Sequence, residues 1–300
     1  MKVLLCGDMD AAELAGWRQA LAAALPEAIW LDRAAARADA GAVQAAVVAN
    51  PPPGSLQGLP NLRLIQSLWA GVDRLLADTT LPAGVPIARM VDPVMSAAMA
   101  ETVLWAVLSL HRDFFAYARQ QLRGLWRTHE QRRADELRVL VLGQGEMGRA
   151  AAARLAALGY RVTGWRRDGT PLSGLLPRAD IVINLLPLTP ATRGLLDARF
   201  FAALPAGASV VNLGRGAHVV DDDLLAALDR GHLHHAVLDV FHTEPLPAGH
   251  PFWAHPRVTV LPHAAAATDP RSAAAVAAVN LRAARDGRPI AHLVDRQRAY

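Results

Sequence analysis

Three glycines near the middle of the chain follow a pattern that strongly limits how the surrounding segment can fold. Gly143, Gly145 and Gly148 have the spacing GxGxxG, directly after the apolar run 137–142 and before an alanine-rich stretch. In such a turn the first glycine permits a tight bend, the second lets the backbone approach a pyrophosphate, and the third lets a helix pack closely on a strand. Glycines also occur in ordinary turns, but this place between a strand and a helix predicts a dinucleotide site.

Apolar runs continue to alternate with helical patterns after this motif, as a doubly wound parallel sheet of the Rossmann type requires. The runs are 137–142, 160–165, 180–186, 208–212, 235–240 and 257–261. The sequence therefore predicts an α/β fold for this part of the chain.

Further apolar runs before the motif predict a smaller, flavodoxin-like α/β unit. These runs are 2–7, 45–49 and 63–67. They alternate with helical patterns such as 10–24, and the late helical pattern 271–286 is expected to return to the same unit. We expect a substrate domain made of 1–97 and 269–300, and a dinucleotide-binding domain made of 98–268.

A long helical pattern, 94–124, is expected to connect the two domains as one helix. Apolar residues recur on one of its faces, namely Met95, Met99, Val103, Ala106 and Leu110. One small domain is not expected to cover this face, which favours a contact with a second subunit.

The composition excludes several kinds of chemistry. The net charge is +4 and 52% of the residues are hydrophobic, as in a globular protein. Lys2 is the only lysine and starts a predicted strand, which excludes catalytic and phosphate-binding lysines. Cys6 is the only cysteine, so no intrachain disulfide forms. Asp8 and Asp10, together with Glu101 inside an apolar run, argue against a secretion signal or a membrane span. A cytoplasmic protein with no membrane partner is expected.

Two polar clusters receive no functional assignment. The first is a run of arginines without the aromatic pattern of a nucleic-acid module, so no nucleic-acid partner is predicted: Arg119, Arg123, Arg127, Arg132, Arg133 and Arg138. The second is His232, His234 and His235, which follow the helical pattern 221–230. Histidines are expected there at a helix C-terminus, where they meet the helix dipole, so no metal site is predicted.

Polar residues that follow the late strands are the candidates for catalysis. Arg215 lies between two glycines after the run 208–212, and its guanidinium fits the carboxylate and carbonyl of a 2-oxo acid. Glu244 and His263 each follow another apolar run. A carboxylate bonded to one imidazole nitrogen fixes the tautomer and favours the protonated ring, so the other nitrogen can donate a proton to a ketone during hydride transfer.

The order of these motifs resembles the D-isomer-specific 2-hydroxyacid dehydrogenase family over essentially the whole chain. The motifs are GxGxxG, Asn212-Leu213-Gly214-Arg215-Gly216, Asp239-Val240-Phe241 with Glu244-Pro245-Leu246, and Pro262-His263. Within the family, the segments 183–187, 212–218 and 294–300 are similar to the glyoxylate/hydroxypyruvate reductase A type.

The resemblance implies a role for each motif. Arg215 binds and polarises the substrate, His263 donates or accepts the proton, and Glu244 supports His263. The segment 67–73 is the substrate loop, in which Trp69, Ala70, Gly71 and Val72 contact the substrate and backbone N–H groups hold its carboxylate.

The cofactor is expected to contact the glycine loop and the ends of the later strands. The predicted cofactor-binding residues are Gly143, Gly145, Glu146, Met147, Gly148, Trp165, Arg166, Arg167, Leu186, Pro187, Leu213, Gly214 and Asp239. By the same resemblance Asp239 holds the nicotinamide carboxamide, and the alternative is an aspartate that caps the end of a strand.

Charge after the second strand of the Rossmann segment indicates the type of cofactor. NAD sites usually carry an acidic residue there, which binds the ribose 2′-hydroxyl. This chain has Arg166 and Arg167, which attract a 2′-phosphate, so NADPH is expected. In the alternative, Asp168 turns inward and the cofactor is NADH.

These observations predict NADPH-dependent reduction of small 2-oxo acids, glyoxylate to glycolate and hydroxypyruvate to glycerate. One alternative is an NAD-dependent dehydrogenase of a bulkier D-2-hydroxy acid, and another is a non-catalytic protein that senses a dinucleotide. The resemblance also implies a homodimer formed through the long helical segment. Trp126 is expected to pack across this interface and to close one wall of the partner's substrate pocket.

Overall fold

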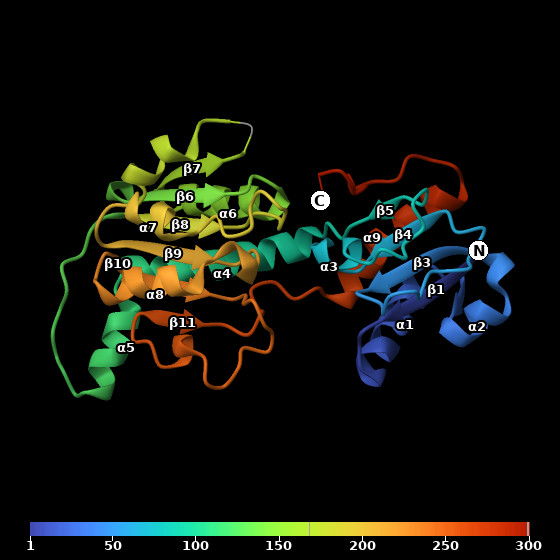
Figure 1. The fold of residues 1–300 in the computed structure, drawn as a ribbon, viewed down its shortest axis with the longest axis horizontal. Coiled ribbons are helices and arrows are strands. Elements are labelled where there is room, and N and C mark those ends of the chain that lie inside the picture. Colours follow the sequence, from blue (N-terminus) through green and yellow to red (C-terminus); the bar gives the residue numbers. More distant parts are fainter. Residues whose placement is uncertain (168, 299) are drawn as a thin grey trace. The chain divides into compact units, whose positions relative to one another are not determined.

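The computed structural model describes residues 1–167, 169–298 and 300, and the chain divides into two compact units. Unit 1 contains Met1–Val94 and Thr268–Tyr300, and unit 2 contains Met95–Ala267. Each unit has its own parallel sheet covered by helices (Figure 1). The α/β fold class expected from the sequence is confirmed for both units.

The sheet of unit 1 has the strand order β2-β1-β3-β4-β5, and all its pairs are parallel. This is the flavodoxin-like order. The strands are β1 (Lys2–Gly7), β2 (Ile29–Leu31), β3 (Val43–Ala49), β4 (Leu64–Ser67) and β5 (Ile87–Ala88). The helices are α1 (Ala11–Ala24), α2 (Arg33–Ala38), α3 (Asp73–Leu76), α9 (Pro270–Arg285) and the short 3₁₀ helix η1 (Ala40–Ala42).

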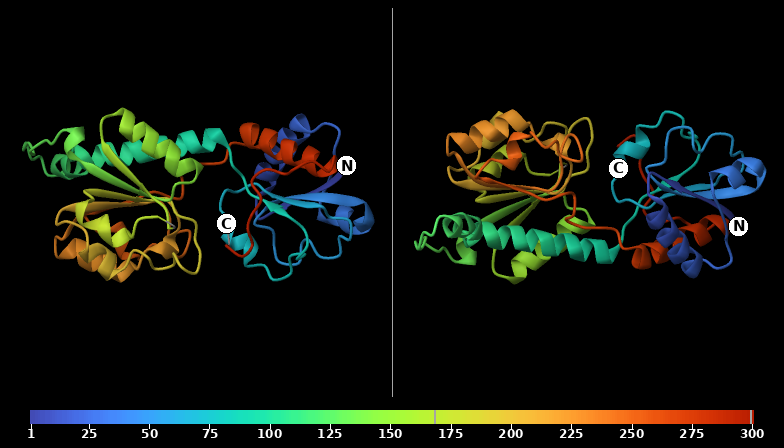
Figure 2. Two further views of the ribbon diagram at one scale, coloured as in Figure 1. Left: turned by 90° about the horizontal axis from the view of Figure 1, so that it is seen from above. Right: turned by 90° about the horizontal axis from the view of Figure 1, so that it is seen from below.

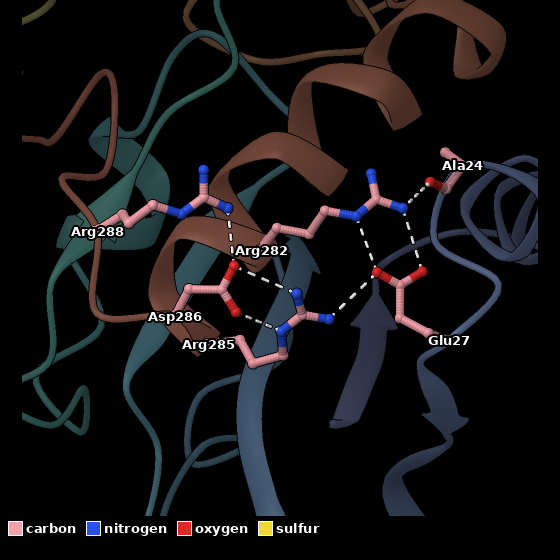
Figure 3. Close-up of polar contacts among 6 residues, drawn as sticks. All are labelled: Ala24, Glu27, Arg282, Arg285, Asp286 and Arg288. Carbon is pink, nitrogen blue, oxygen red and sulfur yellow. Dashed lines mark hydrogen bonds and ion pairs between the residues drawn. The ribbon is translucent and has the colours of Figure 1, made fainter.

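Helix α9 completes unit 1 although it lies far from the other elements in the sequence. It packs on α1 and on the sheet. Arg282 Nε and Nη2 donate to the two oxygens of Glu27 over 2.8 and 3.1 Å, and Arg285 Nη1 reaches the same carboxylate at 3.3 Å (Figure 3). The hydrogen bond from Arg282 lowers the pKa of Glu27 to about 2. These hydrogen bonds hold α9 against the segment that follows α1.

The sheet of unit 2 has the order β11-β10-β9-β8-β6-β7 and is also parallel throughout. Its strands are β6 (Arg138–Leu142), β7 (Arg161–Trp165), β8 (Ile181–Asn184), β9 (Ala208–Asn212), β10 (Leu233–Leu238) and β11 (Val258–Val260). Its helices are α4 (Pro93–His111, which begins in unit 1), α5 (Phe114–Leu122), α6 (Glu146–Ala157), α7 (Ala198–Ala202) and α8 (Asp221–Asp229). Short 3₁₀ helices are η2 (Ala134–Glu136), η3 (Leu172–Gly174), η4 (Leu176–Arg178), η5 (Gly216–His218) and η6 (Pro251–Trp253).

Alternation along the strands of unit 2 produces two cores, one on each face of the sheet. Val139 and Val141 face a core that contains residues of α4 and α6, whereas Leu140 and Leu142 face a core that contains residues of α7 and α8. Figure 2 shows α4 and α6 on one face and α7 and α8 on the other. Because all strands of this sheet are parallel, their carboxyl ends share one edge, where open α/β sheets bind their ligands.

The long helix expected over 94–124 is wrong in one respect, because the structure has two helices there. Helix α4 ends at His111, and α5 begins at Phe114. Asp113 between them has a φ of 56°, which is left-handed and interrupts helical hydrogen bonding.

The expectation that one domain leaves the apolar face of α4 uncovered is also wrong. Met99, Val103 and Leu110 are buried in the core of unit 2 against the sheet. By length and composition alone α4 could cross a membrane in spite of Glu101, and half of it is buried in the protein. Core helices of globular proteins can have the same length and composition, so the apolar character of α4 is explained by its packing in unit 2.

The expected placement of the histidine cluster at a helix end is wrong for two of its members. Helix α8 ends at Asp229, and His234 and His235 lie on β10. His235 is 2% exposed, its Nε2 lies 2.8 Å from the Thr259 hydroxyl, and its ring stacks on Phe115. Its surroundings are those of a core side chain.

This histidine is expected to make the stability of the protein depend on pH. Burial, aided by the charge of Arg119, lowers the pKa of His235 to about 3. In the unfolded chain the pKa is about 6.5, so below that pH the unfolded state binds a proton that the folded state does not. The free energy of unfolding should fall by up to about 1.4 kcal/mol per pH unit as the pH drops from about 6.5 towards 3. Urea unfolding between pH 7.5 and 5 measures this slope.

The variant His235→Gln should unfold with a smaller pH slope, even if it is less stable at pH 7.5. His292→Gln is the control, because this histidine is exposed. Equal slopes for His235→Gln and the unchanged protein would show that another group causes the dependence.

Candidate functional site

The glycine loop between β6 and α6 has the backbone that its motif predicts. Gly143 has a φ of 96°, and a Cβ there would lie 2.7 Å from the Leu185 carbonyl oxygen. A Cβ at Gly148 would lie 1.8 Å from the Gly143 carbonyl oxygen. Gly145 caps α6 without a side-chain bond, and among the described residues no atom beyond its chain neighbours and α6 itself lies within 4 Å of where its Cβ would be. The loop is tightly packed on one side and open at Gly145, a shape that fits a pyrophosphate at the start of α6.

The next two residues lie in the first turn of α6. Glu146 forms an ion pair with Arg149, and Met147 packs against the core under α4 and α6. Their backbone N–H groups belong to the helix N-terminus, whose partial positive charge attracts an anion.

Residues at the end of β7 differ in their surroundings. Trp165 is buried, its indole N–H donates to the Thr170 carbonyl at 2.9 Å, and its own carbonyl accepts from Gly143 N at 3.0 Å. Arg166 and Arg167 are exposed. Asp168, the residue of the NADH alternative, lies outside the described residues. Two cationic side chains therefore follow the strand next to the glycine loop.

The loops after β8 and β9 contact each other through their backbones. A Cβ at Gly214 would lie 3.0 Å from the Leu186 carbonyl oxygen, so a larger residue would push the loops apart. Leu186 and Leu213 are buried, while Pro187 is exposed. These loops form a wall at the carboxyl edge of the sheet, next to the glycine loop.

Arg215 follows Gly214 and is half-buried. Its Nη1 donates to the Gly214 carbonyl at 2.8 Å. Behind it, a Cβ at Gly216 would lie 2.0 Å from the carbonyl carbon of Phe241. The backbone that carries Arg215 is thus held against the loop that follows β10.

The structure brings Glu244 and His263 together, although 19 positions separate them in the sequence. His263 Nδ1 lies 2.7 Å from Glu244 Oε2, and the other oxygen of this carboxylate accepts from Phe241 N at 2.9 Å. An ionised carboxylate only accepts hydrogen bonds, so the imidazole carries a proton on Nδ1. The side chain of His263 is 52% exposed, and its Nε2 makes no hydrogen bond to another described residue.

Asp239 holds the segment that carries His263. Its side chain is buried, and its two oxygens accept from Ala264 N at 2.7 Å and from Ala265 N at 3.0 Å. The Asp239 carbonyl accepts from His263 N at 2.9 Å, and His263 itself has a left-handed φ of 53°. Burial raises the pKa of Asp239, while the two N–H bonds oppose this shift. These contacts are those of the strand-end cap considered from the sequence.

The predicted substrate loop belongs to unit 1. Ser67 Oγ accepts from Trp69 N at 3.0 Å, the Trp69 carbonyl accepts from Met90 N at 3.0 Å, and the Trp69 ring meets the edge of Trp17. Within the described part of the chain, the N–H groups of Ala70, Gly71 and Val72 donate to no acceptor. Consecutive N–H groups of this kind can bind a carboxylate.

Sequence reasoning assigned no role to Asn184, Asn212 or His218, which are buried at the ends of β8 and β9 and in η5. The sequence did contain a signal for the two asparagines, because each ends an apolar strand. A polar group buried there needs hydrogen-bond partners. No group of three or more His, Cys, Asp or Glu side chains within 1–167, 169–298 and 300 has the arrangement of a metal site.

Comparisons with known proteins identify the family of this chain. The model of the D-isomer specific 2-hydroxyacid dehydrogenase NAD binding domain matches residues 104–265. A glyoxylate/hydroxypyruvate reductase A from Serratia proteamaculans is 41% identical over 267 residues, which are 83% of this chain and 85% of the relative.

Solved structures match over the whole chain. A D-isomer specific 2-hydroxyacid dehydrogenase from Xanthobacter autotrophicus, in complex with NADPH and MES, has a TM-score of 0.93 at 40% identity and covers 100% of this chain and 99% of its own. An NADPH-dependent glyoxylate/hydroxypyruvate reductase from Sinorhizobium meliloti, in complex with NADP and sulfate, has a TM-score of 0.92 at 33% identity with the same coverage. By the family match, the identity and the shared fold, this chain is a member of the D-isomer specific 2-hydroxyacid dehydrogenase family.

Proposed function

We propose that this protein reduces small 2-oxo acids with NADPH, with glyoxylate and hydroxypyruvate as its first substrates. The observation that carries the proposal is the His263–Glu244 pair, joined at 2.7 Å in a chain that is 41% identical to a glyoxylate/hydroxypyruvate reductase A. In this proposal unit 2 binds the cofactor, and the 67–73 loop of unit 1 binds the substrate.

Each residue has one task in the reaction. NADPH supplies the hydride when it is bound. Arg215 binds the substrate and polarises its carbonyl, and His263 donates a proton from Nε2 to the oxygen that becomes the hydroxyl. Glu244 keeps the imidazole oriented through its hydrogen bond to Nδ1. The N–H groups of residues 70–72 hold the substrate carboxylate.

Charge and the relatives together support NADPH over NADH. Arg166 and Arg167 follow β7 and are exposed, so they can pair with a 2′-phosphate. Relatives of known structure were solved with NADPH or NADP. An NAD-dependent enzyme for a bulkier D-2-hydroxy acid is the second candidate. The negative charge of Asp168, which lies outside the described residues, favours it.

A turnover assay separates an enzyme from a dinucleotide sensor. The protein is mixed with NADPH and glyoxylate, and the loss of the reduced nicotinamide absorbance is followed. Steady consumption of NADPH supports the proposed function. Tight NADPH binding without consumption of any 2-oxo acid would support the sensor instead.

We also propose that the protein is a cytoplasmic homodimer with a two-fold interface. The free thiol of Cys6 fits a reducing compartment. Several large apolar side chains on α4, on α5 and in the segment after α5 are exposed. Trp105, Leu108 and Phe114 are exposed there, and Leu122 and Trp126 are 88% and 100% exposed. Apolar surface of this extent indicates a protein contact.

The dimer predicts a sedimenting mass of about twice the 32.0 kDa of one chain at micromolar concentration. Trp126→Ala should weaken hydroxypyruvate binding, because Trp126 is proposed to close one wall of the partner's pocket. A 32.0 kDa species would exclude the dimer. A dimer in which Trp126→Ala keeps full affinity would exclude only the role in the pocket.

A further inference from the structure

A buried polar network joins the two loops that follow β8 and β9. Asn184 ends β8 and Asn212 ends β9, and the two residues are direct partners in the parallel pairing of these strands. His218 ends η5, four residues after Gly214. All three side chains are 0% exposed, so each of their polar atoms needs a protein partner.

Backbone N–H groups fix the orientation of both amides. Leu186 N donates to Asn184 Oδ1 at 3.2 Å, so the Nδ2 of Asn184 must face the other way. That Nδ2 lies 2.8 Å from Asn212 Oδ1. Asn212 Oδ1 also accepts from Gly214 N at 3.2 Å, which leaves the Nδ2 of Asn212 to donate to the Arg215 carbonyl at 3.0 Å.

The same logic determines the form of His218. The Nδ2 of Asn184 lies 2.8 Å from His218 Nδ1, and an amide nitrogen only donates, so this Nδ1 accepts. The neutral ring then carries its proton on Nε2, which lies 3.3 Å from the Pro187 carbonyl. These bonds connect the carbonyl of Pro187, which also accepts from Thr192 Oγ1 at 2.8 Å, with the carbonyl of Arg215.

We propose that Asn212 and His218 are positioning residues for the reduction of the 2-oxo acid, linked through Asn184. Asn212 sets the backbone from which Arg215 reaches the substrate, and His218 sets the loop of Pro187 that contacts the cofactor. The inference rests on the proposed function, because it takes Arg215 and Pro187 as parts of that site. The loops cannot relax freely if a bond is lost, since a Cβ at Gly214 would already meet the Leu186 carbonyl at 3.0 Å.

Asn212→Asp tests one end of the network without changing the size of the side chain. One carboxylate oxygen can still accept from Gly214 N, while the other faces the Arg215 carbonyl and cannot donate to it. Displacement of Arg215 should lower kcat/KM for glyoxylate by roughly 10- to 100-fold, the range that follows from a misplaced binding group. The Kd of NADPH, measured by its fluorescence, should change by less than about 2-fold because Arg215 serves the substrate.

His218→Phe tests the other end. It keeps a ring but removes both nitrogens, so the Pro187 carbonyl loses the bond from His218 at 3.3 Å and keeps the one from Thr192 Oγ1 at 2.8 Å. This variant should raise the Kd of NADPH by roughly 10-fold, the cost of about one buried hydrogen bond. Its fall in kcat at saturating NADPH should be smaller than that of Asn212→Asp.

Asn280→Asp is the matched control for a network that only stabilises the fold. Asn280 is buried in unit 1, where its Nδ2 donates to Gln66 Oε1 at 2.8 Å. The control should lower the Tm as Asn212→Asp does, yet keep the kinetic constants of the unchanged protein. If Asn212→Asp does not fold, Asn212→Ser removes the same donor without adding a charge.

The kinetic constants and NADPH affinities of these variants, taken together, test the inference. Kinetic constants of Asn212→Asp or Asn212→Ser that equal those of the unchanged, active protein would overturn the inference. The inference would also be overturned if the variants at position 212 and the variant at position 218 each lost affinity for NADPH and for the substrate to the same extent. An unchanged protein that binds NADPH but reduces no 2-oxo acid would instead refute the proposed function, so the two failures are distinguishable.

Discussion

Replacing His263 with alanine is expected to lower the turnover of glyoxylate by a factor of at least ~100, the usual lower end for general acid–base catalysis. The reason is geometric. Glu244 accepts a hydrogen bond from His263 Nδ1 at 2.7 Å, which leaves Nε2 as the donor to the substrate. Glu244→Gln, which keeps the size of the side chain but removes its charge, should cause a smaller loss because the proton donor remains. Steady-state assays of NADPH consumption measure both losses of turnover.

His292→Ala is a matched control for this experiment. His292 is exposed like His263 and has a similar left-handed backbone, with a φ of 59° against 53°. An alanine at either position therefore carries the same backbone strain. Near-normal turnover in His263→Ala, or an equal loss in His292→Ala, would remove His263 from the mechanism.

Replacing Arg166 and Arg167 together with glutamine is expected to raise the KM for NADPH by about 10-fold or more and to leave the KM for NADH nearly unchanged. Only NADPH carries the 2′-phosphate, and a hydrogen bond to a charged group contributes about 1.5–3 kcal/mol. Steady-state kinetics with each cofactor at saturating glyoxylate measure the two constants.

The control removes the same charge elsewhere on unit 2. Arg154 on α6 and Arg161 at the start of β7 are both exposed. Arg161 lies about 13 Å along the strand from Trp165, which is beyond the distance at which salt screens exposed charges. The double change Arg154→Gln and Arg161→Gln should leave both KM values unchanged. Equal effects of the Arg166/Arg167 change on NADPH and NADH would contradict the assignment.

Features with a strong local signal could be predicted from the sequence. Every apolar run predicted after position 137 corresponds to a strand, and the glycine loop has the φ and the close contacts that its motif requires. The strand β5 escaped prediction because it has two residues, and β2 because its three residues lie between Glu27 and Asp32. The strand β11 also has three residues, but it lies in the longer apolar run 257–261. The break at Asp113 was missed because the helical pattern continues across it, while the backbone there is left-handed.

The partners of polar residues could not be predicted in the same way. Glu244 and His263 were identified as a pair because each follows a strand of one parallel sheet. The bonds from Ala264 and Ala265 to Asp239 depend on the path of a loop, and backbone donors leave no mark in a sequence. The Asn184–Asn212 bond depends on strand register, which only the paired sheet reveals.

A panel of kcat/KM values distinguishes the NADPH-dependent reduction of small 2-oxo acids from the activity of an NAD-dependent enzyme for bulkier acids. The panel contains glyoxylate, hydroxypyruvate and the bulkier phenylpyruvate, each with NADPH and with NADH. We predict the highest values for glyoxylate and hydroxypyruvate with NADPH, at least about 10-fold above the same acids with NADH, as expected for one charged hydrogen bond. A higher kcat/KM for phenylpyruvate with NADH than for either small acid with NADPH would contradict the account.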